Sequence, residues 1–269
     1  MVLREYVRGT IGWSQLEAVA VEVARRFDRD EVHVQFLDAD NWLSIPLVVD
    51  ETWFVKVISP QNSVVHALFT TGRNLGAFSS GTSGFFEHVG SPVELAEREL
   101  VATERMRAVG VNAPKPIEAF EVEGLGVLVL EYLDGFRTLE DVDDETVEEF
   151  APALVESLAR LHDDRLVHGD LRGENVLLHD GELYFIDATT VTEGEGIDDA
   201  RAYDLASALA TLEPHVGARR AVATTREWYS IDDLLAAREF LDFVNLRPDH
   251  DFDGALLKGE IEKAADERE

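Results

Sequence analysis

The chain has 269 residues and no cysteine, and its 54 acidic residues against 24 basic ones give a formal net charge of -30. The lack of cysteine excludes disulfides, thiolate zinc sites and cysteine nucleophiles. Hydrophobic residues make up 45% of the sequence, and no apolar run approaches the roughly 20 residues that span a bilayer. We therefore expect a soluble protein that is either one large domain or two lobes.

The acidic residues are spread along the whole chain, whereas there are only four lysines. A uniformly acidic surface with little lysine stays soluble in multimolar salt, where charge repulsion is screened over roughly 3 Å. The composition thus predicts a cytoplasmic protein of a halophile, and no export signal follows Met1. The scarcity of clustered Lys and Arg argues against strong direct binding of nucleic acid.

The first part of the chain predicts one helix and a small sheet. Apolar residues recur at helical spacing over 13–29. Three runs rich in β-branched and aromatic residues, at 32–37, 43–49 and 52–59, predict an antiparallel meander joined by polar turns. Residues 60–92 carry five glycines among Ser and Thr, so we expect a long, flexible insertion there.

Further along, a strong helix over 93–109 is stopped by Gly110 and followed by strands at 117–123 and 126–133. The remainder is mostly helical, apart from two short strands, NVLLH and LYFID, around a turn. We expect its helices at 145–162 and around 200–213, 231–243 and 254–267. The fold class is therefore α+β, with an N-terminal lobe over 1–133 and a helical C-terminal lobe over 134–269.

The segment VHGDLRGENVLLHDGELYFID is the one that predicts chemistry. It places Asn175 five positions after Asp170, and Asp187 twelve positions after Asn175. Phosphoryl transfer needs a carboxylate that orients the attacking hydroxyl, and oxygen ligands for a Mg²⁺ that bridges the phosphates. Asp170 suits the first task, and the other two residues, at the ends of a hairpin, suit the second. The alternative is two ordinary turns with exposed polar residues.

These motifs resemble the protein-kinase-like superfamily, in which HGDLRGEN would be the catalytic loop and FIDAT would replace Asp-Phe-Gly. Only seventeen positions separate Asp187 from Asp204, too few for an activation loop and a peptide platform, and Gly169 replaces the arginine of regulated kinases. The run YFIDATTV followed by DDARAYDLASAL resembles RIO atypical kinases and the small kinase of the KEOPS complex. The insertion at 60–92 is a RIO feature, so we prefer RIO.

The resemblance implies a bilobal kinase-like fold that uses ATP with Mg²⁺ or Mn²⁺. Lys56, a lone cation in the apolar strand WFVKVI, would contact the ATP phosphates and pair with Glu99, with Glu97 as the alternative partner. An edge-strand lysine with an exposed head is the other interpretation of Lys56. Glu131 and Leu133 would offer backbone groups to adenine.

One departure concerns phosphate binding. The turn DADNW, at 38–42, has no glycine where most kinases have a glycine-rich loop. Either backbone N–H groups of residues 39–41 form a nest, or Gly81 and Gly84 fold over the nucleotide, or ATP binds weakly. Asp204 is expected to be a buried support of the catalytic loop, with His168 as a packed neighbour.

The resemblance predicts a RIO-like serine/threonine kinase or ATPase, which could also phosphorylate its own Asp187. The first alternative is a small-molecule phosphotransferase of the aminoglycoside or choline type, although such enzymes usually have a larger helical domain after the metal aspartate. The second is a pseudokinase scaffold, suggested by the missing glycine loop. Expected partners are a protein acceptor and a complex for ribosome assembly or tRNA modification, with no membrane.

Overall fold

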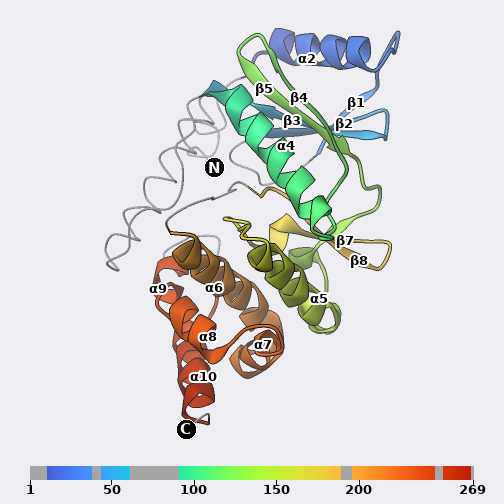
Figure 1. Cartoon of the computed structure of the whole chain (residues 1–269). Helices are drawn as coiled ribbons and strands as arrows, with labels where there is room; N and C mark the ends of the chain where they lie inside the picture. Colours follow the sequence, from blue (N-terminus) through green and yellow to red (C-terminus); the bar gives the residue numbers. More distant parts are fainter. Residues whose placement is uncertain (1–10, 38–43, 61–90, 189–195, 246–250, 268–269) are drawn as a thin grey trace. The chain divides into compact units, whose positions relative to one another are not determined.

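The computed structural model describes residues 11–37, 44–60, 91–188, 196–245 and 251–267 (Figure 1). The expectations for the turn at 38–42 and for nearly all of the insertion at 60–92 lie outside these residues. The described residues form two compact units. The N-terminal unit holds 11–60, 91–104 and 114–134, and the C-terminal unit holds 105–113, 135–188, 196–245 and 251–267.

The N-terminal unit is built on an antiparallel sheet of five strands, as the sequence predicted, and the strands have the order β1-β2-β3-β5-β4. Its strands are β1 (Val34–Phe36), β2 (Ile45–Val49), β3 (Trp53–Ile58), β4 (Pro116–Val122) and β5 (Leu125–Glu131). Helices α2 (Trp13–Arg26) and α4 (Pro92–Ala108) accompany it (Figure 1). Both helices were also predicted.

The two faces of the sheet bury different sets of side chains, because successive residues of a strand point to opposite faces. Val127 and Val129 of β5 pack in one cluster with Val23 of α2. Leu128 and Leu130 of the same strand pack in a second cluster with Ala96 of α4. Both faces are therefore apolar and covered, which explains why β5 is hydrophobic at nearly every position.

Gly126 allows α4 to begin close to the sheet. A β-carbon at this position would lie 2.1 Å from the backbone carbonyl oxygen of Pro92, the first residue of α4. That separation is far below any van der Waals contact, so only glycine fits here without moving the helix. The start of the helix that carries Glu99 is thus fixed by a residue on β5.

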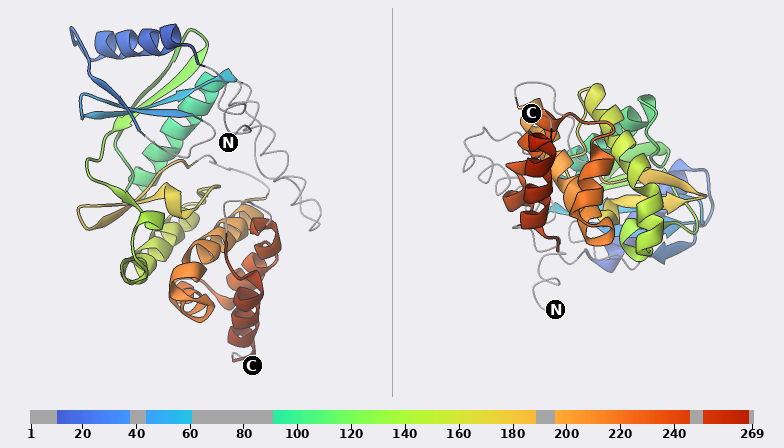
Figure 2. Two further views of the ribbon diagram at one scale, coloured as in Figure 1. Left: turned by 180° about the vertical axis from the view of Figure 1, so that it is seen from behind. Right: turned by 90° about the horizontal axis from the view of Figure 1, so that it is seen from below.

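The C-terminal unit contains most of the helices and a small sheet in the order β6-β7-β8. Its strands are β6 (Arg137–Thr138), β7 (Val176–His179) and β8 (Glu182–Phe185), and two short 3-10 helices are η1 (Leu139–Asp141) and η2 (Gly173–Asn175). Its helices are α5 (Asp144–Asp163), α6 (Ile197–Val216), α7 (Ala218–Thr225), α8 (Ile231–Arg238), α9 (Leu241–Val244) and α10 (Gly254–Asp266). Helix α6 lies at the centre and contacts α5, α7, α8, α9 and α10 (Figure 2).

Tertiary packing changes three details of the prediction. The helix expected at 231–243 is divided into α8 and α9, and the break ends at Phe240, which is buried against the ring of Tyr203. Helix α7 and strand β6 were not predicted, and Gly217, with φ 76°, separates α7 from α6.

None of the helices within the described ranges combines the length and the apolar character of a membrane span.

Candidate active site

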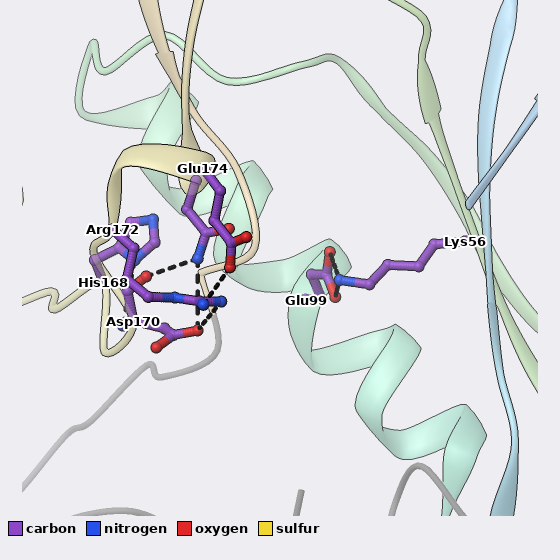
Figure 3. Close-up of polar contacts among 7 residues, drawn as sticks. Lys56, Glu99, His168, Asp170, Arg172 and Glu174 are labelled. Atoms are coloured by element: carbon purple, nitrogen blue, oxygen red, sulfur yellow. Dashed lines mark hydrogen bonds and ion pairs between the residues drawn. The ribbon is translucent and has the colours of Figure 1, made fainter. Parts of the chain in front are cut away.

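Lys56 and Glu99 form a buried ion pair in the N-terminal unit (Figure 3). The Nζ atom of Lys56 lies 3.0 and 2.9 Å from the two carboxylate oxygens of Glu99. Glu97 is exposed, so the partner of Lys56 is Glu99. The alternative of an exposed edge-strand lysine is wrong, because β3 lies between β2 and β5 and the Lys56 side chain is only 8% exposed.

The strand alternation explains this geometry. Lys56 is two residues before Ile58, which packs against Ala96 of α4, so the lysine points to the same face. Taking both charges out of water costs several kcal/mol per ion, and the pair regains this only when its geometry is good. A buried pair with two short contacts is therefore an arrangement that keeps one cation in a fixed place.

The end of β5 holds the two residues expected to contact adenine. The backbone N–H of Glu131 donates to the carbonyl of Lys115 at 2.9 Å, and its carboxylate accepts from the N–H of Lys115 at 3.1 Å. The N–H of Tyr132 donates to the carbonyl of Thr52. Leu133 is buried. The N–H of Glu131 is thus engaged with Lys115, and the adenine role of Glu131 and Leu133 remains a prediction.

Asp170 lies in the loop before η2 and is held by two neighbours in sequence (Figure 3). The guanidinium of Arg172 donates to its carboxylate at 3.2 Å. The side-chain amide of Asn175 donates to the backbone carbonyl of Asp170 at 2.7 Å and lies 3.5 Å from its carboxylate. Gly169, immediately before Asp170, has φ 82°, a conformation that glycine adopts without strain.

Asn175 and Asp187 occupy the two ends of the β7–β8 hairpin, as predicted. The backbone N–H of Ile186 donates to the carbonyl of Asn175 at 3.0 Å, which joins the two ends. Asp187 has φ 59°, an uncommon left-handed conformation outside glycine. Among the described residues no group of three or more His, Asp and Glu side chains could form an all-protein metal cage. An amide and a carboxylate instead suit a divalent ion that keeps waters and binds phosphates.

Asp204 of α6 supports the backbone just before Asp170, and this expectation is confirmed. Its side chain is fully buried and accepts hydrogen bonds from the backbone N–H groups of His168 and Gly169, the latter at 2.8 Å. Hydrogen bonds from backbone donors are what a buried carboxylate needs in place of water. The backbone just before Asp170 is thus tied to a central helix.

His168 is packed inside the C-terminal unit and has no access to solvent. Burial lowers its pKa below the usual 6.5, although the nearby charges of Asp204, Asp170 and Asp187 oppose the shift. Its ring meets that of Phe185 edge to face. These contacts agree with a neutral supporting residue and not with a base that exchanges protons with a substrate.

Sequence analysis did not select two charged residues of the segment HGDLRGEN, Arg172 and Glu174. Arg172 forms ion pairs with both Asp170 and Glu174 (Figure 3). Burial raises the pKa of Glu174, whereas the charge of Arg172 acts in the opposite direction. Their position between Asp170 and Asn175 is the feature of the sequence that could have identified them. One guanidinium therefore balances two carboxylates beside the candidate metal ligands.

Comparison with known proteins agrees with this geometry. Residues 90–197 match the family model described as RIO domain. This part of the chain is therefore similar to RIO domains. The RIO match includes Glu99, Asp170, Asn175 and Asp187, and it excludes Lys56.

Two curated relatives extend the likeness. The chain is 28% identical over 220 residues to the RIO-type serine/threonine-protein kinase Rio1 of Haloferax volcanii, which covers 65% of this chain and 74% of that protein. It is 33% identical over 110 residues to the KEOPS complex subunit Bud32 of Pyrococcus abyssi, covering 38% of this chain and 49% of that protein. The RIO-like chain thus spans about half of the Bud32 relative.

A solved structure shows the fold alone. The crystal structure of a candidate fructosamine-3-kinase from Haemophilus somnus 129PT matches with a TM-score of 0.51 and 12% sequence identity. The alignment covers 93% of this chain and 97% of that one. The RIO-like chain therefore has the mixed architecture of this kinase structure, with a sheet-based N-terminal unit and a helical C-terminal unit.

Proposed function

We propose that this RIO-like chain is an ATP-dependent phosphotransferase, a kinase or ATPase that transfers the γ-phosphate of ATP to a Ser or Thr hydroxyl of a protein, or to its own Asp187. The observation that carries the proposal is the contact of Asn175 with both the backbone and the carboxylate of Asp170. Through it, a carboxylate that can orient a hydroxyl lies beside Asn175, whose carbonyl accepts a hydrogen bond from the residue before Asp187. Asn175 and Asp187 are the two residues that could hold a divalent ion.

In the proposed reaction Asp170 accepts a hydrogen bond from the acceptor hydroxyl and aligns it for attack. Asn175 and Asp187 would hold Mg²⁺ or Mn²⁺, which when bound neutralises charge on the phosphates. Lys56, fixed by Glu99, would bind the phosphates of ATP, and Glu131 and Leu133 would contact adenine. Arg172 limits the repulsion between Asp170 and Glu174, and so keeps the Asp170 carboxylate in place.

The acceptor and the partners follow from the relatives' names. One relative is named a serine/threonine-protein kinase and another a KEOPS complex subunit. We therefore propose that this chain phosphorylates a protein and that it acts within a complex for tRNA modification or ribosome assembly. The acidic, cysteine-free composition supports a location in the cytoplasm.

The test uses purified protein in multimolar KCl with Mg²⁺ and γ-labelled ATP. Phosphate release and label retained on protein are measured for the wild type, Asp170→Ala and Asp187→Asn. Asp180→Asn is the matched control, because it changes an aspartate of the same hairpin at its tip, where the side chain is 90% exposed.

We expect both activities to fall by at least about a hundredfold in the two site variants and to be unchanged in the control. Transfer of label to small aminoalcohols, but not to protein, would instead identify a small-molecule phosphotransferase. A folded wild-type protein that neither releases nor transfers phosphate would contradict the proposal and indicate a scaffold.

A further inference from the structure

A chain of buried polar groups extends from the catalytic loop to the segment between α7 and α8. The hydroxyl of Tyr229 lies 2.7 Å from Nδ1 of His162, at the end of α5. The other ring nitrogen of His162, Nε2, is buried and makes no hydrogen bond within the described part of the chain, and the carboxylate of Asp204 lies 3.5 Å from it. His162 is 1% exposed and Tyr229 is 8% exposed, so water does not replace these contacts.

The arrangement selects one tautomer of His162. The carboxylate of Asp204 can only accept hydrogen bonds, so the tautomer of His162 with its proton on Nε2, the nitrogen that faces Asp204, has the lower energy. A neutral imidazole has a single N–H, which leaves a lone pair on Nδ1. The group facing Nδ1 must then be a donor, and the Tyr229 hydroxyl is that donor. Burial raises the pKa of Tyr229 above its usual value, which keeps the hydroxyl proton in place.

We propose that Tyr229 is a positioning residue for the catalytic loop: its hydroxyl holds His162 in the Nε2–H form, which faces Asp204 and steadies the backbone of residues 168 and 169. The effect on turnover rests on the function proposed above, whereas the effect on His162 and on the loop does not. Tyr229 lies far from Asp170 in sequence and acts only through His162 and Asp204.

The alternative tautomer shows why the hydroxyl matters. Without the hydroxyl, His162 loses the donor that fixes its Nδ1 lone pair, and the ring can carry its proton on Nδ1 instead. A lone pair on Nε2 would then face the negative charge of Asp204, which is fully buried. This repulsion would push Asp204 away from His162, and any shift of Asp204 would displace its backbone donors at 168 and 169.

The first experiment measures the tautomer and the loop without any activity. Protein labelled with ¹⁵N is compared by NMR as wild type and Tyr229→Phe, which removes one oxygen and keeps the ring. We expect the His162 nitrogens of the wild type to show the Nε2–H form, and those of the variant to show a mixture. We also expect the amides of His168 and Gly169 to exchange with solvent about tenfold faster in the variant.

The matched control is Thr225→Val. Thr225 is also fully buried, four residues before Tyr229, and its hydroxyl donates to the carbonyl of Ala221 within α7. This variant removes a buried hydroxyl from the same region without touching His162. It should leave the tautomer and the loop amides unchanged, which separates the relay from general loosening of the helices.

The second experiment measures turnover of ATP. We expect kcat of Tyr229→Phe to fall about tenfold, with KM for ATP unchanged, because the loop that carries Asp170 is displaced while its residues are all present. An Nδ1–H or doubly protonated His162 in the wild type, or unchanged loop exchange in Tyr229→Phe, would overturn the proposal. Equal effects of Thr225→Val would overturn it too. An inactive wild type with the expected tautomer and loop exchange would count against the kinase function alone.

Discussion

The two units bury a charge in different ways. In the N-terminal unit, Lys56 is balanced by a second full charge, the side chain of Glu99 on another element. In the C-terminal unit, Asp204 is balanced mainly by backbone N–H groups of the loop that it supports. A pair of side chains can exchange one partner for a ligand phosphate without moving the backbone, whereas a carboxylate bound to backbone N–H groups fixes the chain itself. The first arrangement suits binding and the second suits positioning.

The largest effect should come from breaking the side-chain pair. Lys56→Ala leaves Glu99 buried without its counter-ion, and we expect the free energy of unfolding to fall by about 3–5 kcal/mol. Denaturant unfolding at constant high salt measures it. Replacing both residues, as Lys56→Met with Glu99→Leu, should recover most of the stability but no ATP turnover. A single variant as stable as the wild type would mean that the pair is not buried in solution.

Asp204→Asn tests the backbone arrangement. The amide keeps one accepting oxygen but loses the charge, so one of the N–H groups of His168 and Gly169 is left poorly bonded. We expect a loss of about 2–3 kcal/mol, measured by the same unfolding experiment. Asp198→Asn, an exposed residue at the start of the same helix, should change stability by less than about 0.5 kcal/mol. Equal effects of the two changes would remove the contrast between the units.

Gly126→Ala displaces the helix that carries Glu99 without changing any charge. Its β-carbon would lie 2.1 Å from the carbonyl oxygen of Pro92, so α4 must move away from the sheet. We expect a loss of about 1–3 kcal/mol in thermal unfolding, with weaker ATP binding if Lys56 acts as proposed. Gly259→Ala, in α10 with open space around it, should instead gain about 0.5–1 kcal/mol.

The smallest effect concerns pH. The folded protein holds His168 with a lowered pKa, whereas the unfolded chain takes up the proton near 6.5. Below that pH the unfolded state binds more protons, so stability is lost as pH falls, by at most about 1.4 kcal/mol per unit. His168→Asn should flatten this slope between pH 6.5 and 5, whereas His33→Asn, at an exposed position, should not. An unchanged slope in His168→Asn would show that His168 is not buried neutral.

Much of the fold was predictable because its signals are local. The β-branched and aromatic runs of the N-terminal sheet and the long helix α4 are patterns within single segments, and Asp170 and Asn175 are only five positions apart. The burial of Lys56 could be expected because a lone cation stood in an apolar strand. These features need no knowledge of distant contacts.

The rest depends on contacts between distant residues. Tyr229 and His162 are 67 positions apart, and nothing in the local sequence of either indicates a hydrogen bond. The break between α8 and α9 likewise follows from packing of Phe240 against Tyr203 on another helix. Strand β6 has only two residues and exists because it pairs with β7. Such elements are set by the assembled core and not by propensity.

Gly169 has a consequence for how this protein could evolve. Regulated kinases carry an arginine before the catalytic aspartate, but here the backbone has φ 82°. A single substitution to arginine would cost about 1–2 kcal/mol of strain, in a loop that is tied to Asp204. An arginine before Asp170 would therefore begin with a loss of stability, and a second change that relaxes the backbone of the loop would be needed to recover it.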